Sequence, residues 1–176
     1  MLQITPGFIF LLLFLTVSCQ KQESYQARVE EIFPPVLVQN VALNRMGNLP
    51  VSVEFFKGQW TLVVFGSGNC KSACQHRLEL VNEAANVKKL LVIDGLATPA
   101  KLRELAGSYP DVAVTMGITA STFDHFYAQF DVESIAPEQK RQHIYLVSPS
   151  AELVYSLSSE NLTADDLAKE ISLLKK

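Results

Sequence analysis

The segment from Trp60 to Phe65 is a short, almost continuous apolar run that is rich in β-branched side chains. Such a run is typical of a central strand that is covered on both faces. Residues 66–69, Gly-Ser-Gly-Asn, interrupt the run. Beyond them the apolar residues recur at helical spacing: Cys74, Leu78, Val81 and Ala85. The sequence therefore predicts a buried strand that leads directly into a helix, and two cysteines stand in the first turns of that helix.

These cysteines, Cys70 and Cys74, are four residues apart. A helix N-terminus lowers the pKa of a thiol, and the neighbouring Lys71 acts in the same direction. We expect Cys70, the more N-terminal of the two, to be the more exposed. The spacing lets the sulfurs either close a disulfide or chelate one metal ion. Two cysteines can also be small buried hydrophobic residues, but their place at a glycine-rich junction favours redox or soft-metal chemistry. The spacing alone does not distinguish those two.

The N-terminus carries an apolar run over residues 7–18 that ends at Cys19. The run is too short for a transmembrane helix, which needs about 20 residues, and matches the apolar region of a signal peptide. Ser18 before Cys19 resembles the lipobox of bacterial lipoproteins, in which cleavage leaves a lipidated cysteine. We expect residues 1–18 to be a lipoprotein-type signal peptide, 19–30 the lipidated N-terminus and tether, and 31–176 the folded domain. An uncleaved anchor or a plain secretory signal are the alternatives.

All three interpretations export the domain, and the first predicts a membrane-anchored lipoprotein that faces the periplasm of a bacterial envelope. If Cys19 carries lipid, the mature chain keeps one cysteine pair and no odd thiol. In an oxidising compartment that pair can rest as a disulfide. The formal charge of −3 includes no basic cluster, so nucleic acid is not an expected partner.

The rest of the chain alternates between strand and helix patterns. The lead-in, residues 30–56, has strand character and a turn at residues 44–48. Later strand patterns cover 90–93, 112–116, 144–147 and 153–157, and helix patterns cover 98–107, 119–130 and 163–174. Alternating strands and helices that end in a hairpin predict an α/β, thioredoxin-like fold. We expect a central mixed sheet flanked by helices, with an N-terminal β-hairpin extension.

Several stretches resemble the Sco/SenC family of copper-handling, thioredoxin-fold proteins. The most discriminating is Phe65-Gly66 followed by the Cys-x-x-x-Cys at residues 70–74, because thioredoxins use Cys-x-x-Cys. Ile93-Asp94 with Thr98-Pro99, the stretch at 145–149 and the lead-in at 41–60 add to the resemblance. Prolines that commonly flank the family's cysteines are replaced here by Lys71 and Gln75. The chain is therefore identified as a divergent member.

The resemblance implies a function. Family members bind copper through both cysteines and one histidine, and they assist assembly of the binuclear copper centre of cytochrome oxidase. Carried over, this makes Cys70 and Cys74 the redox dithiol and two copper ligands. His143 becomes the third ligand, although it stands only two residues before Tyr145, closer than the family's histidine. Independently of the resemblance, Asp94 stands at the C-terminal end of a predicted strand and is expected to orient the site as a supporting residue, with an ordinary turn carboxylate as the alternative.

The expected partner is the cytochrome c oxidase subunit that carries the binuclear copper centre, or another copper or thiol protein of the envelope. The protein itself is expected to be a monomer. The alternative function is a thiol–disulfide oxidoreductase. A peroxiredoxin-like peroxidase fits less well, because Ser67-Gly68-Asn69 lacks the proline and threonine of that class. A scaffold that keeps only the fold is a further alternative. His76 and His125 are expected to face solvent.

Overall fold

A computed structural model of the chain describes residues 29–39, 43–45, 50–95, 97–132, 135 and 139–174. The strands are β1 (Val29–Leu37), β2 (Leu43–Arg45), β3 (Pro50–Val51), β4 (Thr61–Gly66), β5 (Lys88–Ile93), β6 (Ala113–Gly117), β7 (His143–Val147) and β8 (Glu152–Ser158). The helices are α1 (Ser72–Glu83), α2 (Pro99–Ser108), α3 (Ala120–Ala128) and α4 (Ala164–Leu174), with short 3-10 turns η1 (Val53–Phe55) and η2 (Lys140–Gln142). In the described ranges no helix has the length and apolarity to cross a membrane.

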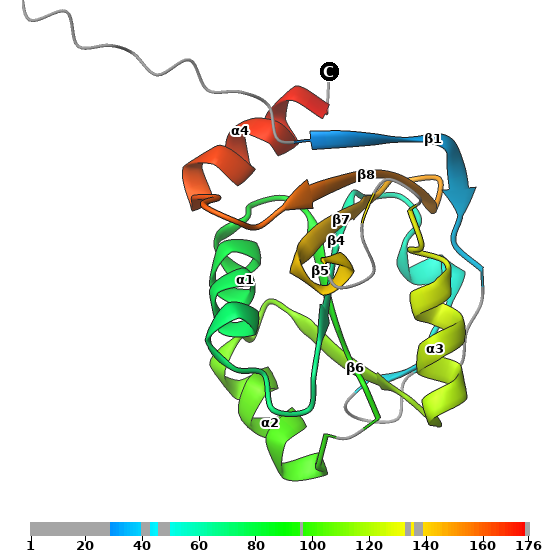
Figure 1. Ribbon diagram of the computed structural model, residues 1–176, viewed down its shortest axis with the longest axis vertical. Coiled ribbons are helices and arrows are strands. Elements are labelled where there is room, and N and C mark those ends of the chain that lie inside the picture. The colour runs from blue at the N-terminus through cyan, green and yellow to red at the C-terminus, as the bar shows by residue number, and fades with distance from the viewer. Residues whose placement is uncertain are drawn as a thin grey trace, which may run out of the picture.

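The strands form one 8-stranded sheet in the order β1-β8-β7-β4-β5-β6-β2-β3. The central strands β4, β5 and β6 run parallel, and β7 pairs antiparallel with β4. Figure 1 shows α1 and α2 on one side of the sheet and α3 on the other. This is the predicted thioredoxin-like architecture, in which a mixed sheet lies between helices.

The central strand β4 is buried along its whole length, as the apolar run predicts. Its side chains alternate between two cores. Leu62 and Val64 pack on the side of α1, α2 and α4, whereas Val63 and Phe65 pack on the side of α3. Paired residues on neighbouring strands point to the same face of the sheet. The face that a side chain occupies can therefore be inferred from the residue it pairs with.

The face towards α3 has an aromatic core around Phe65, whose side chain is fully buried. Five rings lie with their centroids 4.8 to 6.2 Å from that of Phe65: Phe123, Phe126, Tyr127, Phe130 and Tyr145. Four of them form the aromatic stripe of the segment at residues 119–130. The stripe is therefore part of the hydrophobic core.

Three helices begin at a threonine cap, and two helices end at a different residue from the predicted one. Side-chain oxygens of Thr98, Thr119 and Thr163 accept from backbone N–H groups at the starts of α2, α3 and α4. The predicted end of α2 at Gly107 is wrong, because the helix continues to Ser108. Helix α1 ends at Glu83, so the expected inward position of Ala85 is also wrong, and that residue is exposed.

The N-terminal region differs from the expected tether and hairpin in detail. The predicted tether boundary at residue 30 falls inside β1, which pairs with β8 at one edge of the sheet. The predicted hairpin is present as β2 and β3, and β2 pairs with β6, so the hairpin widens the sheet at its other edge. The predicted signal peptide and Cys19 lie outside the described residues.

Candidate dithiol site

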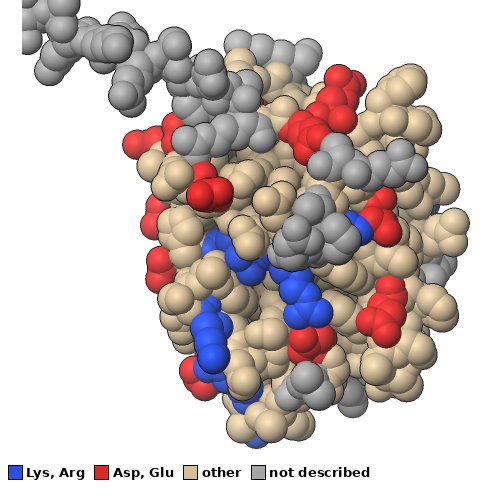
Figure 2. Space-filling model, in the orientation of Figure 1, with Lys and Arg blue, Asp and Glu red and all other residues tan. Residues whose placement is uncertain are grey.

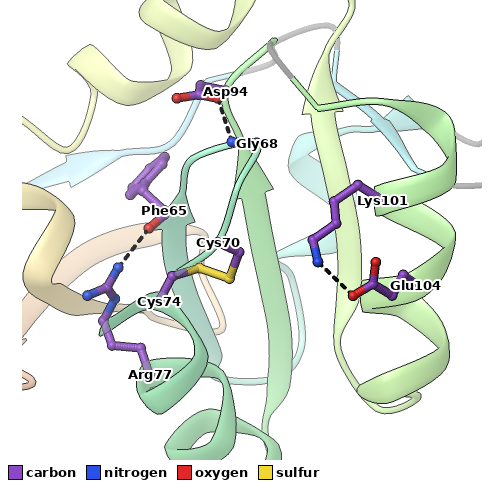
Figure 3. Close-up of a disulfide and its surroundings, with 8 residues drawn as sticks. All are labelled: Phe65, Gly68, Cys70, Cys74, Arg77, Asp94, Lys101 and Glu104. Carbon is purple, nitrogen blue, oxygen red and sulfur yellow. Dashed lines mark hydrogen bonds and ion pairs between the residues drawn. A yellow bond between two sulfur atoms is a disulfide. The ribbon is translucent and has the colours of Figure 1, made fainter. Parts of the chain in front are cut away.

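Cys70 and Cys74 form a disulfide at the C-terminal end of β4, with Cα atoms 5.1 Å apart (Figure 3). Helix α1 begins at Ser72 with Lys71 at its N-cap position. Cys74 therefore lies in the first helical turn, as predicted, but Cys70 precedes the helix. The backbone of Cys70 is left-handed, with φ of 22°, and its N–H donates to Ser67 O over 2.9 Å. A tight turn rather than a helical turn brings the two sulfurs together.

Both cysteines are buried, and Cys70 is the less exposed, at 1% against 6% for Cys74. The expectation that Cys70 is the more exposed is wrong. The turn directs its side chain inwards, where it joins the core beneath α1 with Leu78 and Ile93. Both cysteine side chains are therefore largely shielded from solvent in the oxidised structure.

Gly66 ends β4 directly beside the disulfide. A Cβ atom at this position would lie 3.0 Å from Cys74 Sγ and 2.9 Å from Ile93 Cδ1. These separations are shorter than ordinary van der Waals contact. The missing side chain at residue 66 is therefore what lets the sulfur of Cys74 pack against the strand.

Asp94 follows β5 and fixes the cysteine turn. Its Oδ1 accepts from Gly68 N over 2.9 Å, and its Oδ2 pairs with Arg141 Nη1 over 3.0 Å. The guanidinium of Arg141 lies 5.7 Å from the ring centroids of both Phe123 and Tyr127, within cation–π range. Asp94 thus contacts the loop it was predicted to orient. Arg141 was missed, because only the fold brings residue 141 near residue 94.

Arg77 is a second residue that sequence reasoning missed. It lies one turn after Cys74 in α1 and is 5% exposed, although it carries a charge. Its Nη2 donates to the Phe65 carbonyl over 3.4 Å (Figure 3). Burial lowers the pKa of the Arg77 guanidinium, but arginine stays protonated in proteins. The sequence signals this buried arginine only by its position, because Arg77 interrupts the apolar face of the helix.

His143 lies at the start of β7. This strand pairs with β4, the strand that leads to the two cysteines, so the histidine is in the region where a third ligand was expected. Ile144 faces the core beneath α1, so His143 faces the opposite side of the sheet. Its ring centroid is 6.2 Å from that of Tyr145, which belongs to the core on the α3 side. The structure therefore brings the two cysteines together but does not place His143 beside them.

The histidine environments differ. His143 Nδ1 is buried without a hydrogen-bond partner in the described part of the chain. Burial lowers the pKa of His143, and the nearby Glu30 carboxylate opposes that shift. His76 and His125 are exposed, as predicted. Among the described residues no three His, Cys, Asp or Glu side chains are grouped so that they could hold a metal ion.

Comparison with known proteins identifies the architecture. No family model matches the sequence, and no curated protein matches it. Solved structures do match. Yeast Sco1 with copper bound is 19% identical, with a TM-score of 0.66, over 78% of this chain and 91% of that chain. The fold is that of the Sco proteins.

Two further Sco structures agree. BsSco, a member of the Sco family of cytochrome c oxidase assembly proteins in which a disulfide switch has been identified, is 21% identical, with a TM-score of 0.62, over 81% of this chain and 96% of that chain. A SCO1/SenC family lipoprotein from Bacillus anthracis is 15% identical, with a TM-score of 0.60, over 82% of this chain and 99% of that chain. The Sco fold thus extends over nearly the whole length of each match.

Proposed function

We propose that the chain is an exported, membrane-tethered, divergent member of the Sco/SenC family. In this proposal the dithiol of Cys70 and Cys74 binds copper and serves assembly of the copper centre of cytochrome c oxidase. The observation that carries the proposal is the pairing of these two sulfurs at the end of β4 within the Sco fold. Copper is then a cargo that the protein receives and passes on.

The donor set fits a soft monovalent ion. Cu(I) prefers thiolate sulfur and imidazole ligands. When the disulfide is reduced by two electrons, Cys70 and Cys74 each present a sulfur from the same short segment. When the two thiolates are oxidised, the two electrons pass to a partner disulfide, the S–S bond forms and the copper ligands disappear. The redox state of the pair would therefore control whether copper is held.

His143 as the third copper ligand stays a prediction. In the oxidised structure its ring packs near Tyr145 on the other face of the sheet. Copper held by the two sulfurs alone does not require it, so its contribution can be measured separately from that of the cysteines.

Thiol–disulfide exchange without copper is the second candidate function. The closed disulfide favours it, as does the lack of a histidine beside the sulfurs in the described residues. In the exchange, a thiolate of the reduced pair attacks a partner disulfide, and the second thiolate then resolves the mixed disulfide. The partner leaves as a dithiol, and the S–S bond between Cys70 and Cys74 is restored.

The location of the protein is part of the same proposal. Lipidation at Cys19 and a tether before β1 would hold the domain at the outer side of a bacterial membrane. The sequence at Ser18-Cys19 supports this, and one of the similar structures is itself a lipoprotein. Cys19→Ser should leave an unprocessed precursor without lipid label in whole cells. Normal processing of this variant would refute the lipoprotein signal.

A Cu(I) titration of the reduced full-length protein tests the function. One ion should bind, and Cys70→Ser or Cys74→Ser should remove most of the affinity, because each replaces a soft thiolate by a neutral hydroxyl. His143→Ala should weaken binding less than either cysteine variant. His76→Ala and His125→Ala serve as matched controls, because both side chains are exposed.

The titration separates the candidates. Absence of copper binding above background, combined with turnover of a protein disulfide, would establish the oxidoreductase function instead. If His143→Ala binds copper like the parent while His76→Ala does not, the family-based third ligand is wrong.

A further inference from the structure

Within the described part of the chain, Arg77 is a buried cation without a counter-ion. It is 5% exposed, and its Nε has no hydrogen-bond partner among the described residues. The described ion pairs of the protein involve other basic residues, namely Lys57, Lys101, Lys140 and Arg141. The bond from Arg77 to the Phe65 carbonyl is long, at 3.4 Å, and reaches a neutral group. Buried charges in proteins are normally paired, because removing a charge from water is costly.

Arg77 also lines a groove. The groove has a volume of about 800 Å³ and is lined by residues of α1, by Gln142 of η2 and by the connection between β8 and α4 (residues 159–163). That connection is held in place, because the N–H and the hydroxyl of Ser159 both donate to the Gln142 carbonyl. The groove is thus an open depression on the surface, and its volume lies within the size range of ligand sites, about 300 to 1,000 Å³.

The charges favour a singly charged partner group. A guanidinium recognises carboxylates with two parallel hydrogen bonds. Phosphate sites usually gather several arginines, whereas the described lining of this groove contains one arginine together with the acidic Glu160. In Figure 2 acidic side chains flank the basic ones on this side of the molecule, so the pairing depends on Arg77 itself and not on a wider basic surface.

We propose that this groove binds an extended segment of a partner protein and that a carboxylate side chain of the segment pairs with Arg77. Ala73, next to Cys74 in α1, lines the groove, so a segment bound there lies beside the helix turn that carries Cys74. This placement suits a partner whose cysteines exchange electrons or copper with the pair, and that part rests on the proposed function. The carboxylate pairing does not depend on it.

The test uses the full-length protein and two capped pentapeptides, each with a central glutamate or glutamine between alanines. The glutamate peptide should bind about tenfold more tightly, which corresponds to one charge-assisted contact of about 1.4 kcal/mol. Binding should also shift the NMR signal of the Arg77 Nε–H group. Equal affinity of the two peptides would overturn the inference, and so would propionate binding as tightly as the glutamate peptide, because a small acid would then suffice.

Matched variants avoid disturbing the buried arginine. Ala73 is exposed at the groove, so Ala73→Glu brings a competing carboxylate and should abolish the preference for the glutamate peptide. Ala73→Gln adds a neutral side chain of the same shape as glutamate and should retain the preference. Arg103→Met removes an exposed arginine from α2 and should retain it too. A preference that survives in Ala73→Glu would place the site elsewhere. A double Cys70→Ser, Cys74→Ser variant should still prefer glutamate, so failure of the copper proposal and failure of this one are distinguishable.

Discussion

Substitution of Gly66 by alanine should strain the oxidised protein more than the reduced one. The added methyl group would lie 3.0 Å from Cys74 Sγ and 2.9 Å from Ile93 Cδ1, within the buried core. In the oxidised state the sulfur of Cys74 cannot turn away, because it is bonded to Cys70. After reduction the thiol can rotate to another rotamer, and part of the strain is relieved.

The magnitude follows from overpacking of a close-packed core. An extra methyl group in such a core typically costs about 1–3 kcal/mol. If about 1.4 kcal/mol of that cost is confined to the oxidised state, the reduction potential of the pair rises by about 30 mV. Urea unfolding of both redox states, together with equilibration against a glutathione buffer, measures the two quantities independently.

Gly107→Ala is the matched control. Gly107 lies within α2, and a Cβ atom there would meet no described atom within 4 Å. Alanine is the better helix former by about 1 kcal/mol, so this variant should be stabilised equally in both redox states and should keep its potential. Equal destabilisation of oxidised and reduced Gly66→Ala, or an unchanged potential, would refute the packing argument at Cys74.

Two further predictions concern residues around the site. Asp94→Ala removes the acceptor for Gly68 N, so it should lower the free energy of unfolding by about 1 kcal/mol and speed alkylation of the reduced thiols. Asp94→Asn keeps an acceptor and should change both quantities less. Equal alkylation rates in Asp94→Ala and the parent would contradict a role for Asp94 in holding the turn. The lowered pKa of His143 means that the unfolded chain binds a proton more readily than the folded protein, so stability should be complete above about pH 6.5 and fall as the pH drops below it. His143→Gln should flatten that dependence in urea unfolding at several pH values, and an unchanged slope would contradict the burial effect.

The fold was predictable because its signals are local. The apolar run at Trp60 to Phe65 and the changes from strand to helix period each depend on a few neighbouring residues, and the structure confirms them. Chain order then limits how the strands can pair. The two ends missed on α1 and α2 reflect the weaker signals that terminate helices.

The site was predictable only in part. Cysteine spacing allowed either a disulfide or a shared metal ion, and the inward turn at Cys70 depends on a backbone conformation that its residue type does not demand. The contact from Asp94 to Arg141 joins distant segments, and no sequence pattern encodes it. The face occupied by His143 depends on the register between β4 and β7, where a shift by one residue would reverse it.

The most direct test of the central claim is the amount of Cu(I) retained by the same full-length protein before and after the disulfide closes. The reduced protein should hold one ion, and stoichiometric oxidation by a dithiol-specific oxidant should release it while the disulfide of Cys70 and Cys74 forms. Copper that stays bound after the disulfide has closed would contradict the claim that these two sulfurs are the ligands.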